Sequence, residues 1–330
     1  MGTRVSDLIA VSREVRAALA ARRPVVALET TLVTHGLPFG EGLLTAVELE
    51  AEVRARGAVP ATVGVLDRAL VVGLSESELA RLASAGDAAK LNPSNLAARL
   101  AGGGAGSVTV AATLFAAHRA GIAVFATGGI GGVHRDAGHS GDVSADLTAL
   151  ARFPVATVCA GAKAVLDLPR TLEALETLGV PVYGLGTDRF PAFYRRDSGL
   201  PVDRRFDEVP DLAVAVRAHF ELGLGTAVVV ANPIPAESEM PADQYETALA
   251  AVLREAEEKE VRGRDVTPFL LARLNELTEG GSVFSNRALL LDNARVAAEL
   301  AAALAPKPRR AAGSPRSPRS RRTKASRPRR

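Results

Sequence analysis

Cysteine is almost absent from this sequence, with Cys159 alone among 330 residues. One cysteine cannot form an internal disulfide, which indicates a reducing, cytosol-like compartment. Long apolar runs are also missing: no segment approaches the roughly 20 apolar residues of a membrane-spanning helix, and the charged N-terminal segment has no apolar core of the signal-peptide kind. We therefore expect a soluble, cytoplasmic protein with no membrane partner.

Acidic residues are missing from the C-terminal segment, residues 306–330, which has 11 Lys or Arg and no Asp or Glu. The remaining chain carries 29 basic and 37 acidic residues, so the formal net charge of +3 conceals an acidic body. With little to bury, the segment is predicted to be a disordered basic tail. It could contact RNA through phosphates, but it lacks aromatic residues for base stacking. A solvated extension is therefore the favoured interpretation, and nucleic acid is not required.

Apolar β-branched runs alternate with segments of helical periodicity over residues 1–305. Strands are predicted at 25–29, 61–67, 69–74, 122–129, 154–161, 180–186 and 225–233, and helices at 5–22, 43–57, from Ser75 onward with a capping box to Glu78, and at 107–121, 169–178, 208–222, 240–260, 267–278 and 284–304. This alternation predicts an α/β fold, with a largely parallel or mixed sheet flanked by helices in a single compact domain. Ligands of such folds collect at the carboxyl ends of strands, where Glu29, Lys163 and Asn232 fall.

Two polar stretches each allow more than one function. Residues 126–135, ATGGIGGVHR, follow a predicted strand and match neither a Rossmann nor a Walker motif, so they suit either a phosphate site or a glycine-rich turn. Asp142 and Asp146 are four residues apart, and on a helix their carboxylates would share a face. They could help to hold a hard divalent cation such as Mg²⁺ or Mn²⁺. Alternatively, Asp142 or Ser144 could cap a helix, which the spacing alone favours.

An acid and an amine each follow an apolar strand. Burial would raise the pKa of Glu29 and suit it to general acid catalysis, although hydroxyls of the following loop could equally satisfy it. His35 in that loop is expected to form hydrogen bonds rather than to act as a base. Lys163 could be an ordinary surface lysine or a neutral amine that attacks a carbonyl carbon to give a Schiff base. Their grouping at strand ends favours an enzyme.

Several longer strings make the sequence resemble one family. In order from about Val25 to Ala294 they are ALETTLVTHGLPFGEGL, GAVPATVGVLD, FATGGIGGVHR, DVSADL, VCAGAKAVLDLPRTLEALETLGVPVYGLGTDRFPAFY, VANPIP, TPFLL and NRALLLDNA. These strings are similar to those of the pseudouridine-5′-phosphate glycosidases. The resemblance implies cleavage of the C–C glycosidic bond of pseudouridine 5′-phosphate to uracil and ribose 5-phosphate, one divalent metal ion, usually Mn²⁺, per subunit, and a homotrimer.

The resemblance also implies roles for individual residues. Lys163 in CAGAK would be the covalent nucleophile, Glu29 in ALET the proton donor and Asp142 in DVSADL the metal ligand. Substrate contacts would come from Lys90, Val110, Ser144, Ala145 and Asp146, from Asn286 toward uracil, and from His134, Thr127, Gly128 and Gly129 toward the sugar phosphate. The small residues before Lys163 would leave room for a ribose carbon to reach its amine.

Two other functions stay open. A sugar-phosphate aldolase or lyase could use the same Schiff-base lysine on an α/β sheet. An RNA-binding protein on a retired enzyme fold would explain the basic tail, but the intact Glu29, Asp142 and Lys163 argue against a retired site. Release of uracil from pseudouridine 5′-phosphate separates both from the family's activity.

Overall fold

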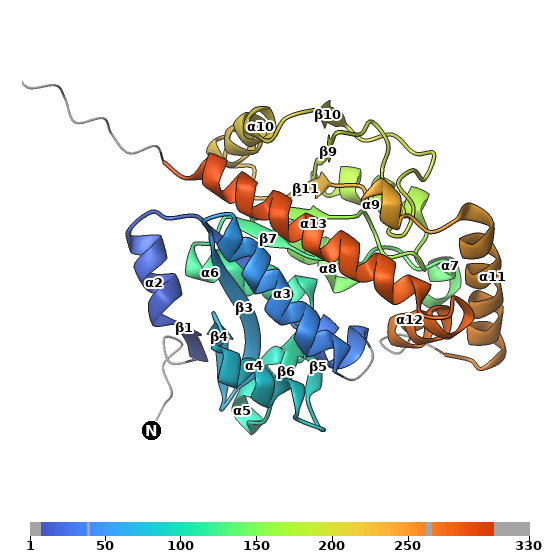
Figure 1. Ribbon diagram of the computed structural model, residues 1–330, viewed down its shortest axis with the longest axis horizontal. Helices are drawn as coiled ribbons and strands as arrows, with labels where there is room; N and C mark the ends of the chain where they lie inside the picture. Colours follow the sequence, from blue (N-terminus) through green and yellow to red (C-terminus); the bar gives the residue numbers. More distant parts are fainter. Residues whose placement is uncertain (1–7, 38–39, 262–265, 307–330) are drawn as a thin grey trace, which may run out of the picture.

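The computed structural model describes residues 8–37, 40–261 and 266–306, and within them eleven strands join into one sheet (Figure 1). In spatial order the main row is β1 (Ile9–Val11), β4 (Ala69–Val72), β3 (Val59–Leu66), β2 (Val25–Leu28), β7 (Val124–Ala126), β8 (Ala156–Cys159), β11 (Val228–Ala231), β9 (Val182–Leu185) and β10 (Arg204–Phe206). A branch of β5 (Ala89–Leu91) and β6 (Gly106–Val108) leaves β3. β3 pairs antiparallel with β4 and β6, and the other pairs are parallel. The predicted α/β class with a largely parallel or mixed sheet is confirmed.

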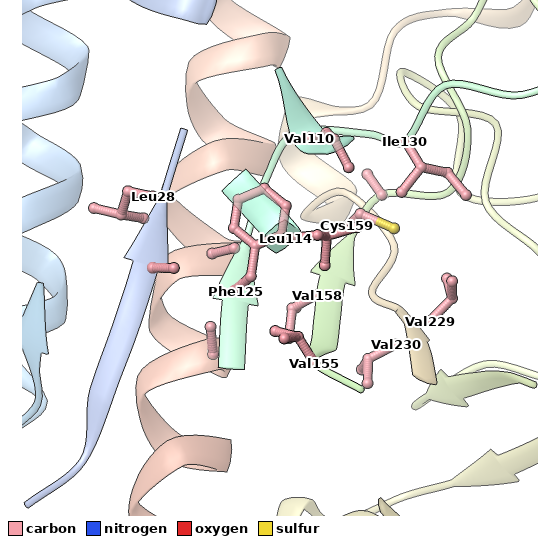
Figure 2. Packing of buried hydrophobic residues seen from close by; sticks show 14 of the residues in the cluster. Leu28, Val110, Leu114, Phe125, Ile130, Val155, Val158, Cys159, Val229 and Val230 are labelled. Carbon is pink, nitrogen blue, oxygen red and sulfur yellow. The ribbon is translucent and has the colours of Figure 1, made fainter. Parts of the chain in front are cut away.

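The central strands are mainly apolar because helices cover both faces of the sheet. Every residue of β2, β3, β7, β8 and β11 is buried. Figure 2 shows Leu28, Phe125 and Val158 on three adjacent strands of this core. The continuous burial fixes the strands in place, so the loops at their carboxyl ends have defined positions.

Helices lie on both sides of the sheet, and Figure 1 shows α13 and α3 in front of it with α6 and α8 behind. The helices of the described residues are α2 (Arg13–Ala20), α3 (Glu41–Ala55), α4 (Glu76–Ala83), α5 (Leu96–Gly102), α6 (Val110–Ala120), α7 (Ala137–Ser140), α8 (Ala145–Leu150), α9 (Leu168–Thr177), α10 (Val209–Glu221), α11 (Ala242–Glu258), α12 (Val266–Leu277) and α13 (Gly281–Leu304), with a π-helical turn η1 (Leu32–Gly36) and a 3-10 turn η2 (Ala236–Ser238). α13 packs across β2, β7 and β8, the strands that carry the candidate site. The predicted capping box of Ser75 and Glu78 is present at the start of α4.

Two predicted helices begin later than expected. Residues 9–11 form β1, which pairs with β4, and α2 starts only after Ser12, whose side chain caps it. Similarly, Gly106–Val108 forms β6 against β3 and β5, and α6 starts at Val110. In both places strand pairing with distant residues overrides a local helical pattern.

Within the described ranges, no helix combines the length and apolarity that crossing a bilayer requires. The predicted disordered tail at residues 306–330 lies, apart from Pro306, outside those ranges.

Candidate active site

The acid and the amine singled out in the sequence meet at one edge of the sheet. Glu29 directly follows β2, Thr127 follows β7, and Lys163 comes shortly after β8. Because β2 pairs with β7 and β7 with β8, all in parallel, the carboxyl ends of these strands are neighbours. The sheet order therefore brings together residues that are far apart in the sequence, as is typical of the ligand-binding crevices of open parallel sheets.

Glu29 is a buried carboxyl, with 7% of its surface exposed. The hydroxyl of Thr127 donates a hydrogen bond to its Oε1. Burial raises the pKa of Glu29, since the charged form loses hydration, while the positive charge of Lys163 and the Thr127 hydrogen bond act in the opposite direction. The net effect is a carboxyl that keeps its proton to higher pH than usual, as a general acid requires.

Lys163 lies where two cavities meet. The larger, of about 320 Å³, is lined mainly by polar residues, among them Asn92, His134, Asp142 and Ser144. The smaller, of about 60 Å³, has Glu29 and Asn286 beside apolar side chains. Lys163 lines both cavities, as do Lys90 and Thr31. The neighbouring Cys159 is fully buried and its pKa is raised to about 12 by burial, so the thiol is no competing nucleophile.

The small residues before Lys163 have a packing reason that differs from the expected one. Gly161 has a φ of +81°, and a Cβ there would lie 2.0 Å from the carbonyl oxygen of Pro191. Ala160 and Ala162 are fully buried. The turn therefore needs small residues because it passes close to the backbone of residues 190–193. The sequence had suggested instead that they leave space for a ribose carbon. The backbone N–H of Lys163 donates to the carbonyl of Ile130 at 3.0 Å, which fixes the base of the amine.

Asp146 is a structural carboxylate that joins two segments of the site. It is 4% exposed, Oδ1 accepts the N–H of Ala111 at 2.9 Å, and Oδ2 accepts that of Gly131 at 2.8 Å. Ser144 caps α8 by accepting the N–H of Asp146, which confirms the capping interpretation. Asp142 precedes α8, so the two carboxylates do not share a helical face. Asp146 joins the start of α6 to the glycine turn and keeps both oxygens occupied.

The larger cavity has a second carboxylate, that of Asp142, which takes no part in the bonds described for Asp146. Its Oδ2 lies 3.8 Å from Nδ1 of His134, and the backbone N–H of His134 donates to its carbonyl. Burial lowers the pKa of His134, while the charge of Asp142 raises it. Among the described residues, no three His, Cys, Asp or Glu side chains gather as a metal site. The carboxylate of Asp142, together with a hydroxyl in the same cavity, fits a hard cation whose remaining ligands are water and substrate oxygens. It does not fit zinc, which takes several nitrogen or sulfur ligands.

The glycine stretch after β7 is mainly a packed turn. A Cβ at Gly129 would lie 2.7 Å from the Phe193 ring, and one at Gly131 would lie 2.2 Å from the hydroxyl of Ser144. Most of its N–H groups already donate to protein acceptors, namely those of Thr127, Ile130, Gly131, Val133 and His134. These glycines therefore permit close approach of neighbouring elements, and the turn leaves few donors for an anion.

The remaining predicted residues divide between the cavities. Thr127, Gly128, Gly129 and Asn286 line the smaller cavity, and Ser144, Ala145 and Asp146 the larger one. Val110 is fully buried, so its side chain belongs to the core and only its backbone adjoins Thr109, which lines the larger cavity. Residues that the sequence did not single out also line them: Thr31, Asn92, Ser94, Asn95, Thr109, Phe193, Leu271 and Leu290. Thr31, Phe193, Leu271 and Leu290 lie within the strings that carry the family resemblance, and the others are close in sequence to Lys90 or Val110.

A buried amide network holds the Thr127 turn from behind. Asn293 of α13 is fully buried and donates from Nδ2 to the carbonyl of Thr127 at 2.8 Å. Its Oδ1 accepts from Nδ2 of Asn232 at 3.0 Å. Asn232, which the sequence placed at a ligand-binding strand end, also donates to Asp292 at 2.8 Å. Asn232 therefore anchors α13 to β11, and it contacts the site through Asn293 and through its backbone N–H, which donates to the carbonyl of Cys159 at 2.9 Å.

Comparison with known proteins places these features in a family. A family model described as indigoidine synthase A like protein matches residues 14–303. The chain is 53% identical to a pseudouridine-5′-phosphate glycosidase of Jannaschia sp. (strain CCS1), over 89% of this chain and 97% of the relative. It is 51% identical to one of Sorangium cellulosum (strain So ce56), over 91% of this chain and 95% of that relative.

Two solved structures share the fold. The crystal structure of the prealnumycin C-glycosynthase AlnA in complex with ribulose 5-phosphate superposes with a TM-score of 0.83 at 42% identity, covering 90% of this chain and 97% of AlnA. An indigoidine synthase A (IdgA)-like protein of Thermotoga maritima gives a TM-score of 0.83 at 35% identity, covering 93% of this chain and 99% of that protein.

Proposed function

We propose, since the chain belongs to the pseudouridine-5′-phosphate glycosidase family, that it cleaves the C–C bond of pseudouridine 5′-phosphate to give uracil and ribose 5-phosphate. The observation that carries the proposal is the position of Lys163 between a polar and a partly apolar cavity, with buried Glu29 alongside. A sugar phosphate suits the polar side, and a flat base suits the side with Phe193 and Asn286. The C–C bond that joins the sugar to the base then lies beside the amine of Lys163.

The chemistry of a C-glycoside gives a reason for an amine. Paired carboxylates cleave O-glycosides by protonating a departing oxygen, and a carbon leaving group offers no such lone pair. In the proposed first step Lys163, which has first released its ammonium proton to water, attacks C1′ through its neutral amine and the bond from C1′ to the ring oxygen breaks. Glu29 gives its proton to that oxygen, which becomes a hydroxyl, and the nitrogen then loses a proton to the Glu29 carboxylate.

In the second step the base departs. Glu29 returns the proton to C5 of the base, the C1′–C5 bond breaks, and the nitrogen lone pair forms the C=N bond of a Schiff base. Uracil leaves with the new hydrogen on C5. Water then hydrolyses the Schiff base, which regenerates the amine of Lys163 and releases ribose 5-phosphate. The raised pKa of Glu29 supports both proton donations.

A divalent ion, with Mn²⁺ as the first choice, is part of the proposal. Asp142 would hold it, since Asp146 has both oxygens bound to backbone N–H groups. When bound, the ion would supply positive charge that organises water and phosphate oxygens. His134 is placed to hold Asp142 in position from 3.8 Å.

A homotrimer is the proposed assembly, on the family resemblance alone. Sedimentation or light scattering of the purified chain measures its mass, and a monomer would contradict the proposal.

Uracil release tests the function directly. The purified chain is incubated with pseudouridine 5′-phosphate, with Mn²⁺ and with a chelator, and uracil is followed by its absorbance. Release in the presence of Mn²⁺ is expected. No release would refute the proposal and leave a sugar-phosphate aldolase or lyase, whose Schiff base would form without this substrate.

A further inference from the structure

His35 is a polar side chain of the smaller cavity that the proposed steps do not use. It lies in η1, the π-helical turn that follows Glu29, and lines the cavity together with Glu29, Lys163 and Asn286. The ring is half-buried. It therefore faces the space assigned above to the base rather than the one assigned to the sugar phosphate.

A chain of hydroxyl groups fixes which ring nitrogen of His35 carries hydrogen. The hydroxyl of Thr34 donates its single hydrogen to Oγ of Ser107 at 2.8 Å. The same Thr34 oxygen lies 2.5 Å from Nδ1 of His35. Since that oxygen has no second hydrogen, Nδ1 must be the donor in this contact. In the neutral ring Nε2 is then a hydrogen-bond acceptor.

The surroundings of His35 keep the ring neutral. Burial lowers its pKa below the usual histidine value, and the positive charge of Lys90 lowers it further. A neutral ring at neutral pH retains the Nε2 lone pair. Lys90 lines the same cavity, so the two effects act where a base would bind.

Pyrimidine chemistry suits this acceptor. Uracil joined to ribose through C5 has free N–H groups at both N1 and N3, whereas a base joined through nitrogen has lost one of them. The apolar side chains of Phe193, Leu271 and Leu290 can contact the faces of a planar ring. The Asn286 amide can meet a carbonyl at its edge, which leaves a ring N–H for the histidine.

We propose that Nε2 of His35 accepts a hydrogen bond from a ring N–H of the departing base, which makes His35 a specificity-determining residue. This inference rests on the function proposed above. It assigns recognition of the base to a second residue beside Asn286 and places that residue on η1. A base whose ring nitrogen carries a methyl group or a lone pair in place of that hydrogen would be rejected.

The test compares kcat/KM for pseudouridine 5′-phosphate with that for its N1-methyl and N3-methyl derivatives. The wild-type chain is expected to reject one methylated substrate. In His35→Leu the preference for the parent over that substrate should fall by about tenfold or more, because the acceptor is gone. His35→Gln, which keeps an acceptor near the same position, should retain most of it. His139→Leu, at an exposed histidine of α7, is the matched control and should behave as wild type.

A second readout separates recognition from folding. Ribose 5-phosphate should form a Schiff base with Lys163 in every variant, since His35 does not face the sugar phosphate. Borohydride should then reduce this Schiff base to a stable adduct. If His35→Leu loses this trapping, the result for His35→Gln decides. A wild-type preference for the parent substrate in His35→Gln supports the proposal. Loss of that preference in His35→Gln while trapping stays intact overturns the proposal. Wild-type turnover of both methylated substrates at the parent's rate, or unchanged preference in His35→Leu, would also overturn it. No uracil release by the wild type would instead refute the proposed function.

Discussion

At the scale of single residues, Glu29 connects the fold to the reaction. Its burial makes the charged carboxylate unfavourable and so keeps a proton available, which the proposed first step gives to the ribose ring oxygen. The same burial costs stability whenever the carboxylate ionises. Activity and stability therefore depend on the same titration.

Glu29→Gln should remove turnover while stabilising the protein at higher pH. The folded wild type holds the Glu29 proton above the usual carboxyl pKa of 4.5, where the unfolded chain has released it. Its stability consequently falls as pH rises through this window, by up to about 1.4 kcal/mol per pH unit. Glutamine does not ionise and can still accept the Thr127 hydrogen bond. Urea unfolding of both proteins at several pH values measures the difference, and a pH-independent difference would contradict the account.

Residue-scale inference from the sequence found Glu29 and Lys163 because a polar side chain directly after a buried strand is conspicuous. It could not find the use of Asp146, whose partners Ala111 and Gly131 come from the start of α6 and from the glycine turn. It also assigned the small residues around Gly161 to substrate space, since the approach of Pro191 is a property of the folded chain. The individual catalytic roles came from resemblance and stay predictions.

At the scale of elements, the turn after β8 depends on one glycine. Gly161→Ala should destabilise the protein by several kcal/mol, because the new Cβ meets the Pro191 carbonyl at 2.0 Å and φ is +81°. Gly179→Ala is the matched control: φ is +69° there, but nothing lies within 4 Å, so strain of about 1–2 kcal/mol is expected. Thermal unfolding of both variants measures this, and equal losses would contradict the packing explanation.

Helix α13 supports the site through Asn293. Asn293→Leu should leave the Thr127 carbonyl buried without its donor and cost about 1–3 kcal/mol. The Thr127 hydroxyl would then hold Glu29 less firmly, so kcat should fall more than KM changes. Asn275→Leu in α12 is the control, because the buried Oδ1 of Asn275 has no hydrogen-bond partner among the described residues. A stability loss without an effect on kcat would show that the network does not position Glu29.

Element prediction succeeded where a strand forms an apolar run of its own, and it failed for three-residue strands that continue into a helical pattern or carry charged residues. The runs at β2, β7, β8 and β11 are buried throughout and, apart from Thr157 in β8, apolar, and they were predicted from sequence. The three-residue strands β1 and β6 were absorbed into predicted helices, and β5 and β10 were not predicted. Such short strands exist through pairing with β4, β3, β6 and β9, which a local pattern does not contain.

At the scale of the whole molecule, the catalytic unit and the basic tail differ in the sign of their net charge, since the tail is basic and the rest of the chain is acidic. A chain ending at Pro306 should retain the melting temperature and the kcat/KM of the full chain, since both cavities are lined by residues before it. Salt-sensitive RNA binding, if the full chain shows it, should disappear on truncation. A large loss of turnover in the truncated chain would show that the tail takes part in the reaction.

The central claim is that Lys163 forms the covalent bond to C1′. The sequence has five lysines, of which Lys90 and Lys163 line the site. Wild type and Lys163→Ala are incubated with pseudouridine 5′-phosphate and borohydride, and the modified peptide is identified by mass spectrometry. The wild type is expected to carry a reduced pentose-phosphate adduct on Lys163, and the Lys163→Ala chain is expected to fold but to show neither adduct nor uracil release. An adduct on Lys90 instead, or uracil release by Lys163→Ala, would contradict the claim.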